Sequence, residues 1–214
     1  MPEIHFAPID SYIDASTALL IQLQELLTSI PAISPDSGGE GELDKCLALE
    51  AWLKEQGLNN VERFDAPDPR AKGGIRPSLV LSLPGPLPGA QGPTLWIMSH
   101  LDVVPPGEIA LWSRDPWKLH VEDGRLYGRG VEDNQQGLCA SLLAALAVKN
   151  TASGAGADSF AGADSSAGAD SFAGADSFAG ADSSAGADSS AGAPSHVKLL
   201  FVADEEMGSK YGIQ

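Results

Sequence analysis

Apolar residues recur at three- and four-residue spacing near the N-terminus, which predicts two amphipathic helices. The first is expected over about residues 10–30 and ends before Pro31, because proline cannot continue a helix. A run rich in turn-forming residues, SPDSGGEGE, separates it from the second helix, expected over about residues 42–56. Gly57 is suited to end that helix in a left-handed conformation.

Farther along, the pattern changes to short apolar or β-branched runs between Pro and Gly, which predicts strands. LVLSL and LWIM contain few polar residues, as expected for strands buried on both faces. A hairpin is expected to turn at Asp123-Gly124. The expected strands cover residues 61–64, 78–83, 94–98 and 196–203, and a long apolar helix covers residues 135–149. This alternation predicts an α/β fold with a mixed, mostly parallel sheet and helices on both faces.

Residues 151–194 interrupt this pattern with a segment of low complexity. Residues 156–191 are six tandem hexapeptides, GADSFA or GADSSA, which offer too little apolar surface for a packed repeat. We expect a disordered insertion, since lengthening a loop to this size costs only about 2 kcal/mol of closure entropy. A tail that binds a partner is the alternative. The segment divides the chain into residues 1–150, 151–194 and 195–214.

Charge and composition exclude several classes of protein. The net charge is −16, and six of the negative charges are aspartates of the repeat. The absence of a basic run argues against nucleic-acid binding. No apolar stretch reaches the roughly 18 residues that cross a bilayer, and the first residues do not resemble a secretory signal. Two cysteines, Cys46 and Cys139, are expected to be free thiols packed in a cytoplasmic protein.

Three clusters of chemically capable residues follow strands or begin a helix. They are Ser99-His100-Leu101-Asp102, Gly128 to Asn134 with the sequence GRGVEDN, and Asp204-Glu205-Glu206. Taken singly, each has a structural explanation: a His–Asp hydrogen bond, a helix N-cap and a solvated acidic loop. Imidazole and carboxylate groups at the carboxyl ends of strands are also suited to bind a metal. Their joint occurrence favours the metal site.

The motifs themselves resemble a known family. SHLDVVPPGE, DGRLYGRGVEDNQQG and FVADEEMGSKYGI are similar to the signature blocks of the di-zinc aminoacylase and carboxypeptidase family. That family includes acetylornithine deacetylase, succinyl-diaminopimelate desuccinylase and carboxypeptidase G. The resemblance implies that residues 1–150 and 195–214 are parts of a zinc-peptidase catalytic domain. It also implies hydrolysis of an amide bond in an N-acyl amino acid or dipeptide.

Each role implied by the resemblance falls on one residue of this chain. His100 would bind one zinc ion, Asp133 would bridge both ions, and Glu206 would bind the second. Asp102 would support the imidazole of His100, and Glu205 would be the general base. Two zinc ions are implied, with cobalt as a possible substitute. Neither a nucleic acid nor a membrane is an expected partner.

The resemblance is incomplete in two respects. The family pattern has a lysine shortly after the bridging aspartate, where this chain has Asn134-Gln135-Gln136-Gly137. In addition, the family's later metal ligands and its lid or dimerisation domain have no counterpart in the sequence. We therefore expect weak zinc binding, little hydrolysis, and a homodimer only for a full-length chain. The alternatives are an inactive truncated chain and a non-catalytic interaction module, and the substrate stays open between desuccinylase, deacetylase and dipeptidase types.

Overall fold

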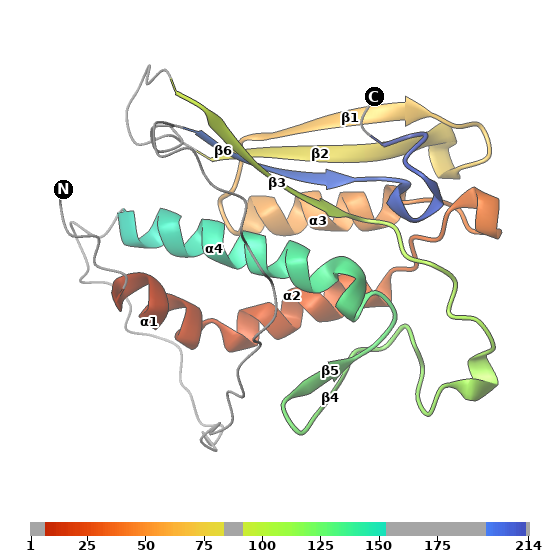
Figure 1. Cartoon of the computed structure of the whole chain (residues 1–214), viewed down its shortest axis with the longest axis horizontal. Coiled ribbons are helices and arrows are strands. Elements are labelled where there is room, and N and C mark those ends of the chain that lie inside the picture. Colours follow the sequence, from red (N-terminus) through yellow and green to blue (C-terminus); the bar gives the residue numbers. More distant parts are fainter. Residues whose placement is uncertain (1–6, 84–91, 153–195, 213–214) are drawn as a thin grey trace, which may run out of the picture.

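The computed structural model describes residues 7–83, 92–152 and 196–212, in which a layer of helices packs against a sheet (Figure 1). The helices are α1 (Ala7–Ala15), α2 (Thr17–Ser29), α3 (Leu43–Glu55) and α4 (Gln136–Ala152). The strands are β1 (Val61–Pro67), β2 (Ile75–Leu83), β3 (Thr94–His100), β4 (His120–Glu122), β5 (Arg125–Tyr127) and β6 (His196–Val202). Single helical or irregular turns lie at Pro35–Ser37, Lys72–Gly74, Ile109–Leu111, Val131–Gln135 and Glu205–Met207.

The main sheet has the strand order β1-β2-β6-β3. Strand β6 pairs parallel with β3 and antiparallel with β2, and β1 pairs antiparallel with β2. A mixed α/β fold is therefore confirmed. The expected predominance of parallel pairs is wrong for the described strands, because the short connection from β1 to β2 joins antiparallel neighbours. The longer connection through α4 permits the parallel pair of β3 and β6.

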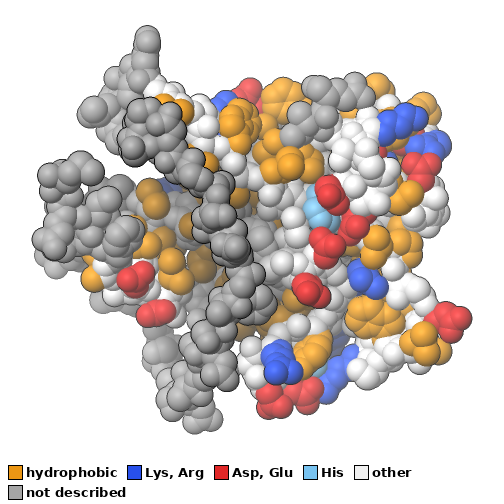
Figure 2. Space-filling view, in the orientation of Figure 1, with side chains coloured by type: hydrophobic (Ala, Val, Ile, Leu, Met, Phe, Trp, Pro, Cys, Tyr) orange, Lys and Arg blue, Asp and Glu red, His pale blue; other side chains and the backbone are white. Residues whose placement is uncertain are grey.

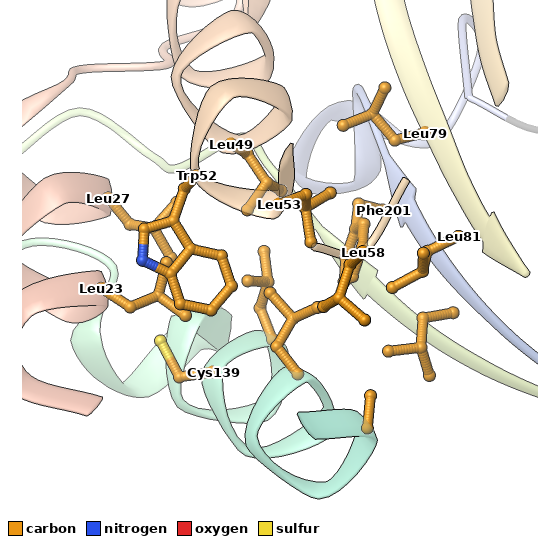
Figure 3. Close-up of a cluster of buried hydrophobic side chains, with 14 of the residues drawn as sticks. Leu23, Leu27, Leu49, Trp52, Leu53, Leu58, Leu79, Leu81, Cys139 and Phe201 are labelled. Atoms are coloured by element: carbon orange, nitrogen blue, oxygen red, sulfur yellow. The ribbon is translucent and has the colours of Figure 1, made fainter. Parts of the chain in front are cut away.

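The hydrophobic core lies between the helices and one face of the sheet. Leucines of α2, α3 and α4 meet side chains of β2 and β6, as Figure 3 shows for Leu27, Leu53 and Phe201. All three of these side chains are completely buried. The described helices lie on this one face, so the expectation of helices on both faces is wrong for this part of the chain (Figure 1).

Two helices, α1 and α2, replace the single helix expected over residues 10–30. The break falls at Ser16, whose hydroxyl donates a hydrogen bond to the Tyr12 carbonyl at 2.6 Å. The Ser16 N–H bonds the Ile13 carbonyl, three residues back, instead of the fourth. A serine can compete in this way for backbone partners and interrupt a helix, which the apolar spacing does not reveal.

The other expected elements are confirmed within a few residues. Helix α3 ends before Gly57, which has a φ of 67° and closes the helix in the left-handed conformation. Asp123 and Gly124 both have positive φ values, 50° and 70°, as the two-residue hairpin turn requires. Cys46 and Cys139 are free, buried thiols, and burial raises the pKa of each to about 12.

Strand β3 differs from its expected burial on both faces. Its four central side chains, Leu95 to Met98, are between 37% and 58% exposed. The strand lies at the edge of the sheet, and within the described residues no further strand pairs with it. Only its last two residues, Ser99 and His100, are buried.

The repeat lies outside the described residues, so the disordered insertion and the three-part division of the chain stay predictions. Among the described helices we find none with the length and apolar content needed to cross a membrane.

The assignment of the core predicts how two substitutions change the free energy of unfolding. Leu53→Ala removes a completely buried side chain and should lower the free energy of unfolding by about 2–5 kcal/mol. Leu111→Ala is the matched control, because Leu111 is 81% exposed and its truncation should change stability by less than about 0.5 kcal/mol. Urea denaturation followed by circular dichroism measures both. Equal stability of the two variants would contradict the assignment of the core.

Candidate metal centre

The parallel pairing of β3 and β6 brings two of the three clusters together. His100 is the last residue of β3 and lies opposite Val202, the last residue of β6. The loops that leave these strands therefore begin side by side, at the edge where sites form in α/β sheets. The third cluster is the irregular turn Val131–Gln135, which leads into α4. Within this turn the peptide bond between Asp133 and Asn134 is cis.

Three side chains converge at this edge. Donor atoms of His100, Asp133 and Glu206 all lie within 4.8 Å of one another. His100 Nε2 is 3.1 Å from Asp133 Oδ1. Figure 2 shows acidic side chains gathered around a histidine on one face of the molecule. One imidazole with two carboxylates is a donor set that suits a divalent transition metal.

The imidazole of His100 is oriented by the neighbouring backbone. Its Nδ1 lies 2.9 Å from the carbonyl oxygen of Asp102. A carbonyl oxygen only accepts hydrogen bonds, so Nδ1 carries a hydrogen, and loss of the proton on Nε2 would leave the lone pair of Nε2 available to a cation. Metal-binding histidines are commonly held by such a bond from the other ring nitrogen.

The side chain of Asp102 makes further contacts, which the sequence does not indicate. Both of its carboxylate oxygens accept hydrogen bonds from the loop after β6: Oδ1 from the Glu205 N–H at 3.1 Å and Oδ2 from the Glu206 N–H at 3.0 Å. Its Oδ1 is also 3.6 Å from His100 Nδ1. Asp102 thus fixes the positions of His100 and of both glutamates.

Negative charge accumulates around the three donors. Burial and the neighbouring Asp133 raise the pKa of Glu206. Burial acts to lower the pKa of His100, but Asp102 and Asp133 outweigh it and raise that pKa to about 9. Glu205 is half exposed, and its Oε2 lies 3.8 Å from His100 Nε2. A bound cation would relieve this repulsion between carboxylates and would replace the proton on His100.

Beneath the site lies a layer of buried charges that sequence analysis missed. Arg76 bonds both carboxylate oxygens of Glu42, and one of its nitrogens lies 3.1 Å from Asp204 Oδ1, without hydrogen-bond alignment. Asp68 Oδ2 is 3.7 Å from the same guanidinium. Lys45 is buried, and its ammonium has no hydrogen-bond partner. Arg76 gave no signal in the sequence, because it precedes the strand expected over residues 78–83 and joins β2 only in the structure.

Comparison with known proteins supports the resemblance found in the sequence. Residues 96–162 match the model of peptidase family M20/M25/M40. An uncharacterized metallohydrolase from Methanococcus maripaludis is 29% identical over 197 residues, which cover 90% of this chain and 37% of the relative. A succinyl-diaminopimelate desuccinylase from a Methylobacterium species is 37% identical over 139 residues, 63% of this chain and 31% of the relative.

The chain therefore resembles peptidase family M20/M25/M40, as its motifs predict. Its fold agrees, since the structure of the di-peptidase Dug1p from Saccharomyces cerevisiae superimposes with a TM-score of 0.64 at 18% identity. That match covers 96% of this chain and 36% of Dug1p. The chain thus spans about a third of the length of these relatives and of Dug1p. The resemblance to metallohydrolases implies a metal cofactor, and the donor set of His100, Asp133 and Glu206 suits one.

The buried layer yields a prediction about pH. Burial lowers the pKa of Lys45 from its usual 10.5 to about 7, although Asp102 and Glu42 favour the charged form. Between these values the unfolded chain binds more protons than the folded chain, so this lysine makes stability rise with pH. Lys45→Met removes that contribution. We therefore expect the free energy of unfolding of the unaltered chain to increase relative to Lys45→Met between about pH 7 and about pH 9.5.

Urea denaturation at the two pH values measures this difference. Lys54→Met, which replaces an exposed lysine of the same helix, is the control and should follow the pH dependence of the unaltered chain. Parallel stability profiles for Lys45→Met and the unaltered chain would contradict the assignment.

Proposed function

We propose that the site is part of the catalytic centre of a zinc-dependent amidohydrolase or peptidase. The observation that supports this proposal is the convergence of His100, Asp133 and Glu206, with Nε2 of the imidazole directed toward Asp133. His100 and Asp133 would hold one ion, and Asp133 and Glu206 the other. When bound, zinc supplies Lewis acidity, which polarises a scissile carbonyl and makes water a stronger nucleophile.

Glu205 is proposed as the general base. Its carboxylate lies beside the three donors but is not one of them, and it is half exposed. It is therefore free to take a proton from the attacking water and pass it to the leaving amine. Asp102 holds the backbone N–H groups of Glu205 and Glu206, so the base and a metal ligand are positioned by the same carboxylate.

The proposed substrates are small amides, either N-acyl amino acids or dipeptides. The relatives include a succinyl-diaminopimelate desuccinylase and a fold neighbour that is a di-peptidase, which supports this class without choosing between its members. We place the reaction in the cytoplasm, and we expect a homodimer only where a dimerisation domain accompanies this part of the family fold.

Metal binding and turnover test the proposal together. The chain is dialysed to equilibrium against zinc, which also detects weak binding, and analysed for bound metal. It is then assayed on N-succinyl-diaminopimelate, N-acetylornithine and simple dipeptides. His100→Ala should lose the metal. Glu205→Gln should keep the metal but lower turnover at least about 100-fold, because only the proton acceptor is removed.

His120→Ala is the control, since His120 lies in the β4–β5 hairpin and outside the donor cluster. It should change neither property. A chain that retains no metal, or a His100→Ala variant that retains as much as the unaltered chain, would refute the metal centre. Metal retained without hydrolysis of any amide in the panel would instead favour the non-catalytic alternative.

A further inference from the structure

Gln135 stands out because its side chain is buried although it lies only two residues after Asp133, the most exposed part of the metal centre. The Asp133 side chain is 75% exposed, whereas Gln135 is 2% exposed. Its amide points away from the metal centre and into the helical layer. Gln135 belongs to the run that departs from the family pattern, where a lysine is usual. Because glutamine is uncharged and is not a usual metal ligand, its residue type does not mark it as part of a site.

The Gln135 amide is anchored on helix α2. Its Oε1 accepts hydrogen bonds from Gln24 Nε2 at 2.5 Å and from Thr28 Oγ1 at 3.1 Å. Its Nε2 donates to the Leu27 carbonyl at 3.4 Å. Cys139 Sγ lies 3.6 Å from Gln24 Oε1 and extends the cluster to α4. Buried polar groups whose partners are all in place fix one arrangement of a core.

Two glycines of the GRG motif make this contact possible. A Cβ atom on Gly130 would lie 2.7 Å from Gln135 Nε2, and a Cβ on Gly128 would lie 2.7 Å from Thr28 Cγ2. Gly130 also has a φ of 82°, and its carbonyl accepts the backbone N–H of Gln135 at 3.0 Å. The close approach of Gly128 to α2, and of Gly130 to the Gln135 side chain, therefore requires residues without side chains at both positions.

Besides the contact of its own carboxylate with His100 Nε2, Asp133 is held through the two residues that follow it in sequence. Asn134 Oδ1 accepts the backbone N–H of His100 at 3.2 Å, which ties the turn to β3. Gln135 ties the same turn to α2. The backbone at Asp133 and Asn134 departs from helical geometry, so intrahelical hydrogen bonds do not fix it there.

We propose that Gln135 is a positioning residue, which holds the Asp133 carboxylate at the metal centre through its buried amide contacts with Gln24 and Thr28. This proposal rests on the proposed function in one respect, namely that Asp133 is a metal ligand. The anchoring of the turn to α2 is independent of that role. An apolar residue at position 24 or 135 would be easier to bury, so the matched pair of amides is explained by the geometry it imposes on the turn.

The test uses Gln135→Met, which keeps the length of the side chain and removes its hydrogen bonds. We expect the dissociation constant for Co²⁺, titrated into the metal-free chain, to rise about tenfold or more, as for other residues that orient metal ligands. In hydrogen-exchange mass spectrometry of the metal-free chain, amides of residues 129–136 should exchange about tenfold faster. Gln24→Met should have the same two effects, and the double variant should add little to either single one.

Leu23→Ala is the matched control. Leu23 is a buried neighbour of Gln24 on α2 whose side chain makes no hydrogen bond, so its truncation lowers stability and leaves the Co²⁺ affinity and the exchange of residues 129–136 unchanged. An unaltered exchange rate in both Gln135→Met and Gln24→Met would overturn the proposal. So would additive effects in the double variant, or equal effects of Leu23→Ala.

The two proposals fail in different ways. If the unaltered chain binds no Co²⁺, the proposed function fails, while the exchange comparison still decides whether Gln135 anchors the turn. If Co²⁺ binds equally to the unaltered chain and to Gln135→Met, the metal centre stands and the positioning role is overturned.

Discussion

The carboxylate of Asp102 is the contact on which the arrangement of the metal centre depends. Parallel pairing of β3 and β6 brings two loops to the same edge of the sheet, but pairing ends where the strands end. Beyond that point Asp102 accepts the N–H groups of Glu205 and Glu206, and its carbonyl orients His100. One buried residue therefore positions His100, Glu205 and Glu206, three of the residues with a proposed chemical role.

This arrangement has an electrostatic cost that the layer beneath it offsets. Asp102, Asp204, Asp68 and Glu42 are all buried, and an unpaired buried carboxylate is strongly destabilising. Arg76 contacts three of these four groups, and Lys45 lies near Asp102 and Glu42, which favour its charged form against the effect of burial. Since the acids still outnumber the bases, the layer keeps the site electronegative, which favours a cation at the surface above it.

The sequence predicted the elements and motifs because both depend on local signals. Leu49 and Leu53 have helical spacing, and Asp123-Gly124 is a dipeptide typical of hairpin turns. His100 follows an apolar run that predicts a strand. The contacts that organise the site are not local. Gln24 and Gln135 are 111 residues apart, and Arg76 is 34 residues from Glu42, so neither pair is visible as a pattern. The break at Ser16 was missed because a single hydroxyl causes it.

The exposure of β3 shows why these distant contacts matter. A strand is usually held by burial of its faces, but the middle of β3 is exposed and its apolar side chains lie at the sheet edge. Its carboxyl end is fixed differently: the Leu101 N–H bonds the Val202 carbonyl at 2.7 Å, and the His100 N–H bonds Asn134. The imidazole is thus positioned by polar contacts at one end of the strand. The precision of the site therefore depends on the turn that carries Asp133 and on its attachment to α2.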